Sequence, residues 1–235
     1  MRGAPRPSDA YRFGRLLCGL FLYAVGIVLT VHANLGASPW DVFHLGLAEK
    51  FGLTFGVTNI AVSVVVVTIA ALMGERIGIG TLCNVVSIGV FIDLLRYAGW
   101  VPEMRSFVPG VAMLVAGLFV IAFATVLYIG AEYGAGPRDS LMVALTRLTG
   151  RPAGFCRCCV EGTVLFFGWL LGGVAGIGTL IAALGIGVAV QVAFGLAHFD
   201  VKRIRHESLA DTWRRMTRRE TAAENNFTRK GEGEE

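Results

Sequence analysis

Charged side chains are scarce in this chain of 235 residues. Asp, Glu, Lys and Arg together make up 16% of it, whereas hydrophobic residues make up 54%. A soluble domain carries charge on roughly a quarter of its residues. Between the few charged places lie apolar runs that reach the roughly 18 residues with which a helix crosses a bilayer. The scarcity of charge excludes a soluble globular protein and predicts a multi-pass membrane protein with the lipid bilayer as its partner.

Catalytic and metal-binding motifs are missing as well. The sequence contains no HExxH, GxSxG or P-loop pattern, and an enzyme needs a nucleophile, a base and an orienting group that converge. Cysteine is sparse, and the segment FCRCC at 155–159 has no His at ligand spacing. We therefore expect no enzyme, no catalytic residue, no cofactor and no metal site.

The apolar runs predict six membrane spans. A basic stretch, 202–219, directly follows the last of them, and juxtamembrane Lys and Arg are the ordinary signal of a cytoplasmic segment. We therefore assign this stretch to topology and expect no nucleic-acid partner. The predicted spans are 13–33, 55–73, 81–98, 108–131, 155–171 and 177–199.

Two intervals between the predicted spans also have a helical pattern. In 38–53, large apolar residues recur at helical spacing, and leucines do the same in 136–150. Each interval is too short to cross a bilayer. We expect one short helix in each, either re-entrant or interfacial.

Motifs of the first half of the sequence recur in the second half at a constant offset. GASPWD at 36–41 returns as GAGPRD at 134–139, and GIGTL at 78–82 returns at 176–180, in both cases 98 positions later. Such a gap-free match on uncommon residues indicates internal duplication. Because the first span has its counterpart in the middle of the chain, we expect a retained span there and not a signal peptide.

Each copy contains three spans, and an odd number of spans inserts the second copy upside down. Most arginines fall in segments that this arrangement places inside, which predicts a bacterial plasma-membrane protein with both termini cytoplasmic. The predicted fold class is all-α, a polytopic bundle of two inverted three-span repeats. Its parts are a cytoplasmic segment at 1–12, repeats at 13–98 and 111–199 around an external connector at 99–110, and a basic cytoplasmic tail at 200–235 whose end is disordered.

The repeated motif has the chemistry of a helix start. Pro39 and Pro137 fit the first helical position, and Gly36 and Gly134 allow a sharp turn before it, so these four residues form a broken-helix motif. An Asp at the third position has two interpretations. It caps the short helix by accepting backbone N–H groups, or it lies deep in the bundle as a proton or cation site.

The residues singled out for substrate or ion binding are polar groups of the motif or of the spans. Arg138 replaces Trp40 in the second copy, and it is interpreted as a surface arginine, as a partner of Asp139 or Glu161, or as an anion ligand. Arg157 is expected to pair with Glu161 four residues later. The candidates are Asp41, Asp139, Asn84, Arg138 and Glu161.

The segments LGASPWDVFHLGLAEKFGLTFG, GERIGIGTLCN, GAGPRDSLMVALTRLTG and GWLLGGVAGIGTL resemble the bacterial YczE-like membrane proteins of the broader YitT/YczE group. The likeness extends over about 13–199. It implies an integral plasma-membrane protein of bacteria and carries no functional residues with it.

Together these patterns favour a small secondary transporter or exporter with the two aspartates as coupling-ion or substrate groups. The alternative is a non-transporting accessory protein that binds a membrane partner or lipid through small residues on its helices. Six spans are few for one substrate pathway, which leaves a homodimer open. The substrate or ion is not defined by these residues.

Overall fold

The computed structural model describes residues 8–198, and within this range the chain forms eight α-helices and no strand. The tail predicted at 200–235, and residues 1–7 of the predicted N-terminal segment, lie outside the described residues. The helices are α1 (Asp9–His32), α2 (Pro39–Phe51), α3 (Phe55–Leu72), α4 (Ile79–Ala98), α5 (Phe107–Ile129), α6 (Pro137–Thr149), α7 (Ala153–Leu170) and α8 (Ile177–Leu196).

Six of these helices are long and apolar enough to cross a membrane: α1, α3, α4, α5, α7 and α8. They confirm the predicted multi-pass, all-helical architecture, and their ends lie within four residues of the predicted ones. The largest difference is at the start of α1. There the Ser8 side chain caps the helix by accepting from the Tyr11 N–H, so the helix begins in a polar turn that hydropathy does not detect.

The two remaining helices, α2 and α6, are the short ones expected from the sequence. Each has 13 residues, begins with proline and ends at a glycine in the left-handed conformation, Gly52 with φ 63° and Gly150 with φ 64°. Proline suits the first turn because that turn has no use for its missing N–H, and glycine adopts positive φ without strain.

The helices of the second half begin 98 residues after those of the first. This offset relates α1 to α5, α2 to α6, α3 to α7 and α4 to α8. It is the offset of the sequence match, and three of the four pairs also have equal lengths.

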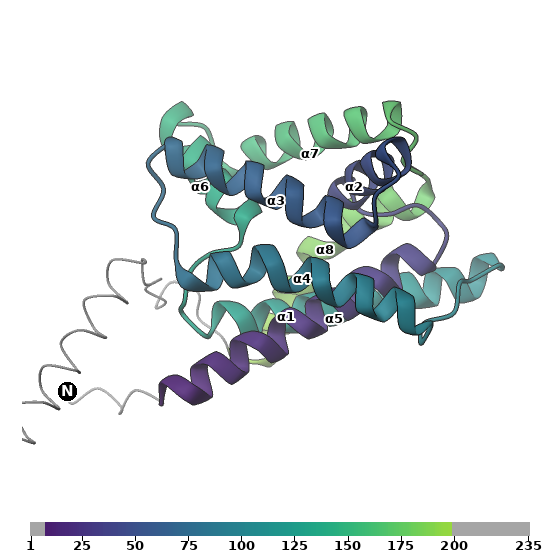
Figure 1. Cartoon of the computed structure of the whole chain (residues 1–235), viewed down its shortest axis with the longest axis horizontal. Helices are drawn as coiled ribbons and strands as arrows, with labels where there is room; N and C mark the ends of the chain where they lie inside the picture. The colour runs from purple at the N-terminus through teal and green to yellow at the C-terminus, as the bar shows by residue number, and fades with distance from the viewer. Residues whose placement is uncertain (1–7, 199–235) are drawn as a thin grey trace, which may run out of the picture.

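The helices are arranged in two layers (Figure 1). One layer contains α1 and α5, which pack along each other, with α4 against α1 and α8 against α5. The other contains the short helices and their partners, with α2 against α7 and α6 against α3. Each short helix therefore packs mainly on a span of the opposite half.

The loops that precede the two short helices bind the opposite half through equivalent hydrogen bonds. The Gly178 N–H donates to the Leu35 carbonyl oxygen at 2.7 Å, and the Gly80 N–H donates to the Tyr133 carbonyl oxygen at 2.8 Å. Both donors and acceptors are 98 positions apart. Thr81 also donates to the Ala135 carbonyl oxygen at 2.6 Å. The GIGT segments are thus contact points between the halves.

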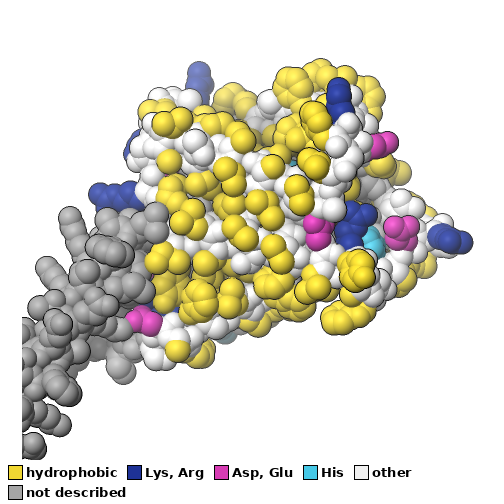
Figure 2. All heavy atoms as spheres, viewed as in Figure 1, with side chains coloured by type: hydrophobic (Ala, Val, Ile, Leu, Met, Phe, Trp, Pro, Cys, Tyr) yellow, Lys and Arg dark blue, Asp and Glu magenta, His cyan; other side chains and the backbone are white. Residues whose placement is uncertain are grey.

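The outer surface is largely apolar. Figure 2 shows hydrophobic side chains spread over the face of the bundle, with most charged groups toward its edges. Large side chains such as Val65, Leu72, Leu184 and Val188 are more than half exposed. Exposed apolar area on this scale suits lipid contact, because water would penalise it.

Candidate functional site

The first turns of α2 and α6 meet at one cavity of about 300 Å³. Ser38 and Gly136, the residues that cap these helices, line it together with both prolines. The remaining walls come from α1, α3, α4, α5, α7 and α8, so every helix contributes to the cavity. A cavity between helix N-termini offers unpaired N–H groups and the positive ends of two helix dipoles.

All five residues singled out for substrate or ion binding line this cavity: Asp41, Asp139, Asn84, Arg138 and Glu161. Their ligand-binding role stays a prediction. Of the broken-helix residues, Pro39 and Pro137 line the cavity too. Gly36 and Gly134 stand before it with φ values of 105° and 132°, and their backbones press against the GIGT segments of the opposite half.

Asp41 is buried at the cavity wall with 1% of its surface exposed. Its Oδ2 accepts from Ser38 Oγ at 2.5 Å, whereas Oδ1 is buried and has no hydrogen-bond partner among the described residues. The carboxylate therefore does not act as the backbone cap that its position suggested. Burial raises the pKa of Asp41, and the Arg138 charge and the Ser38 hydrogen bond oppose this rise.

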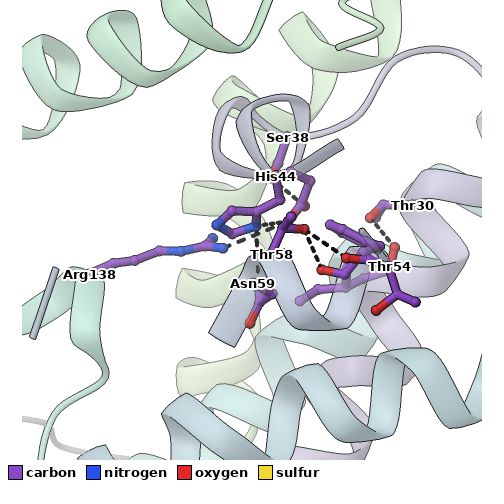
Figure 3. Close-up of polar contacts among 10 residues, drawn as sticks. Thr30, Ser38, His44, Thr54, Thr58, Asn59 and Arg138 are labelled. Carbon is purple, nitrogen blue, oxygen red and sulfur yellow. Dashed lines mark hydrogen bonds and ion pairs between the residues drawn. The ribbon is translucent and has the colours of Figure 1, made fainter. Parts of the chain in front are cut away.

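Arg138 lies between the two halves of the protein (Figure 3). Its Nη2 is 3.7 Å from Asp41 Oδ1, and its guanidinium lies 5.0 Å from the centre of the Trp40 ring. The expectation that Arg138 pairs with Asp139 or Glu161 is therefore wrong, because the two helix starts face each other and bring the arginine of one motif to the aspartate of the other. The Arg138 side chain is 29% exposed, and its interpretations as a surface residue or as an anion ligand stay predictions.

The other charged residues of the cavity have partners nearby. Tyr128 OH donates to Asp139 Oδ2 at 2.8 Å. Arg157 Nε donates to Glu161 Oε1 at 2.8 Å, which confirms the pair expected from their spacing. If all are ionised, the lining holds three carboxylates and two guanidinium groups, an excess of one negative charge.

His44 is buried next to Asp41, and Figure 3 shows it beside Asn59. Its Nδ1 lies 3.8 Å from Asp41 Oδ1 and 3.2 Å from Asn59 Nδ2. Its ring packs near Trp40 and Phe55. Burial, assisted by the Arg138 charge, holds the pKa of His44 well below its usual range, so the ring is neutral at pH 7.

Several cavity residues were not singled out from the sequence, although the offset could have found them. Asn59 and Ser63 on α3 have their counterparts 98 positions later in Arg157 and Glu161 on α7. All four line the cavity. The offset does not single out Tyr128, because its counterpart is Thr30. An aromatic residue in an apolar span is ordinarily interpreted as a packing residue.

These features define a class of protein: a multi-pass membrane protein with a polar cavity between two short helices. Comparison with known families is consistent with this class. The family described as "Family of unknown function (DUF6198)" matches residues 10–194, and the chain belongs to this family.

Three relatives support the assignment. The "Uncharacterized membrane protein YczE" of Bacillus subtilis is 37% identical over 175 residues, which cover 74% of this chain and 80% of the relative. An "Uncharacterized protein" of Haemophilus influenzae is 33% identical over 75% of this chain and 80% of its own length. The "Uncharacterized protein YyaS" of Bacillus subtilis is 28% identical over 80% of this chain and 95% of its own length. The resemblance to YczE-like proteins is thereby confirmed, and no solved structure matches the chain.

Proposed function

We propose that the protein is a small secondary transporter, without an enzymatic step, built from two inverted copies of one unit. The observation that carries this proposal is the meeting of two equivalent helix starts, each with an aspartate, at one internal cavity. Transporters built from inverted repeats bind their solutes at such broken helices, near the middle of the membrane.

The matching helix bounds and the crossed loop contacts support the duplication. Three spans in each half support the inversion, since the second copy must then enter from the opposite face. The arginine distribution supports cytoplasmic termini. A cavity between such copies lies on their common axis and can be opened toward either side by equivalent movements.

The chemistry of the cavity favours a solute or coupling ion with positive charge. Asp41 Oδ1 is a buried carboxylate oxygen without a hydrogen bond, and a buried charge of this kind is costly until it is paired. With all of these groups ionised, the described residues of the lining have an excess of one negative charge. Arg138 touches this carboxylate only at ion-pair distance, so a proton or a small cation can compete with it there.

Proton flux into liposomes tests the proposal. Purified protein is reconstituted with an internal pH-sensitive dye, and an inside-negative potential is imposed. We expect faster internal acidification with the wild type than with Asp41→Asn or Asp139→Asn, and Glu103→Gln serves as a control outside the cavity lining. Equal rates in all variants and in protein-free liposomes would contradict proton-coupled transport.

A second, apolar cavity supports the alternative of an accessory protein. It measures about 690 Å³ and is lined by side chains such as Phe43, Leu47, Val62 and Val164. Such a space fits a lipid chain or an apolar helix of a partner. A protein that showed no flux but retained tightly bound lipid after purification would favour this alternative.

A further inference from the structure

The two halves differ at one pair of helices. In the first half, α3 packs along α4, but their counterparts α7 and α8 have no contact of comparable extent. The other main pairs of helices recur in both halves. The polar cavity is therefore closed by α3 and α4 on one flank and is left without this closure on the other.

A pair of glycines on each flank shows the same difference in helix contact. A Cβ placed on Gly56 would fall on the Gly89 carbonyl oxygen, and a Cβ on Gly89 would lie 2.5 Å from the Gly56 carbonyl oxygen. The backbones of α3 and α4 thus touch at these glycines. Their counterparts, Gly154 on α7 and Gly187 on α8, have no atom of residues 8–198 within 4 Å of such a Cβ. The second half therefore has glycines that would allow a close contact of α7 and α8, but the two helices do not make this contact.

The closed flank is also held by polar bonds. Asp93, near the end of α4, accepts from Thr54 Oγ1 at 2.5 Å and from the Gly56 N–H at 2.8 Å. These bonds fasten the start of α3 to α4. In the second half the corresponding positions are Gln191 and Pro152. Neither can reproduce the carboxylate–hydroxyl bond, so a closed second flank would be held less firmly.

Exposure follows the same division. Ile88 and Asn59 on the closed flank are 4% and 3% exposed, whereas their counterparts Ile186 and Arg157 are less buried. These residues line the cavity. The unclosed flank is therefore a way into the site, between the start of α7 and the second part of α8.

We propose that α7 and α8 form one gate of this cavity and α3 and α4 the other, and that the gates close in alternation. In the present conformation the Gly56–Gly89 gate is shut, and the Gly154–Gly187 gate is open. In the opposite conformation Gly154 and Gly187 come into contact, and Asp93 releases the start of α3. This inference rests on the proposed transport function, and with cytoplasmic termini the open gate faces inward.

Cysteine cross-linking tests the closing of the open gate. Gly154→Cys and Gly187→Cys are introduced together, without the native Cys18, Cys83, Cys156, Cys158 and Cys159, and membranes are oxidised with copper phenanthroline. A disulfide forms only when the Cα atoms approach to about 4.4–6.8 Å. Both positions have room for a side chain, so the substitutions do not disturb the open state. Free thiols are then counted by maleimide-PEG after denaturation.

A matched control uses Gly162→Cys and Gly195→Cys on the same two helices. These glycines also have open space around them, but their counterparts, Val64 and Tyr97, are exposed in the first half. We expect disulfide formation within one chain for the gate pair, reversed by reductant, and none for the control pair. Free thiols in both pairs, or a disulfide between two copies of the chain, would overturn the proposal.

Asp93→Asn provides a second test that does not depend on the gate residues' own packing. The amide keeps the shape of the carboxylate but carries no charge, so the contacts to Thr54 and Gly56 lose their charge assistance. We expect the rate of gate cross-linking to rise roughly tenfold, the effect of losing one charge-assisted hydrogen bond. An unchanged rate in folded protein would contradict the alternation. Flux without cross-linking would reject the gates alone, and cross-linking without flux would reject transport.

Discussion

Arg138 and Asp41 lie 97 positions apart in the chain, yet Arg138 Nη2 is 3.7 Å from Asp41 Oδ1. The pair joins the first turns of two helices that belong to different halves of the protein. By the offset of 98 positions, the counterpart of this pair is Trp40 and Asp139. Trp40 offers no charge to Asp139, and its ring packs against the Arg138 guanidinium instead. The starts of α2 and α6 thus bring different charges to the cavity although their backbones are equivalent.

This ion pair should contribute measurable coupling energy. We expect Arg138→Gln and Asp41→Asn to be less destabilising together than the sum of the single changes, because each single change leaves a charge without its partner. For a partly exposed pair the coupling should be about 1 kcal/mol. Thermal unfolding of the four proteins in one detergent measures it. Additive effects would show that the two charges do not interact.

The pH dependence of stability should differ between the wild type and Asp41→Asn. Because burial raises the pKa of Asp41, the folded protein holds this proton more tightly than the unfolded chain. Its stabilising contribution is therefore full below the ordinary Asp pKa and is lost as the pH rises through the raised value. Arg138 and His44 face the same carboxyl and are unchanged in both proteins.

Melting temperatures at a series of pH values provide the measurement. We expect the wild type to lose stability relative to Asp41→Asn as the pH rises above about 4, the ordinary range of an aspartate. The His44 ring contributes in the opposite sense, since its lowered pKa costs stability at acid pH in both proteins. A constant difference between the two curves at every pH would mean that Asp41 does not titrate on unfolding.

The spans and the short helices could be predicted because their signals are local. Runs of apolar residues gave the spans within four residues, and the proline and glycine at the ends of α2 gave that helix almost unaltered. The constant offset also placed Asp41 and Asp139 at equivalent positions. What it could not show is that the two motifs meet at one cavity, because that depends on how helices of different halves pack.

The partner of Arg138 illustrates this limit. Its sequence neighbours offered Asp139, and helix spacing gave no reason to consider Asp41. The packing of α2 on α7 and of α6 on α3 decides the contact, and it involves residues about a hundred positions apart. The difference between the α3–α4 and α7–α8 pairs has the same origin: equal glycines occur in both halves, and only the structure shows which pair is in contact.

The contact of the loop before α2 with the opposite half leads to a prediction about Gly36. Gly36→Ala should destabilise the fold strongly, because its φ is 105° and a Cβ would lie 2.5 Å from the Gly176 backbone nitrogen. Gly52→Ala is the matched control, since Gly52 also has a positive φ but a Cβ there would have no described atom within 4 Å. We expect a loss of about 1 kcal/mol for the control and at least about 2 kcal/mol for Gly36→Ala. Equal losses in detergent unfolding would show that the loop contact is dispensable.

The opposed orientation of the two halves predicts opposite accessibility for two exposed positions. Lys50 lies in the last turn of the first short helix and Arg151 follows the second, and both side chains are exposed. Single cysteines at these positions, in a chain without the native cysteines, are treated in intact cells with a membrane-impermeant maleimide. We expect labelling at position 50 and none at position 151 until the cells are opened.

This result separates the inverted architecture from a parallel one independently of any substrate. If the halves were parallel, both short helices would emerge on the same side, and the two cysteines would react alike in intact cells. Equal labelling would therefore remove the basis for alternating gates, since α3–α4 and α7–α8 would then close the same side of the cavity. Labelling at position 151 alone would keep the inversion and reverse the orientation, which places both termini outside.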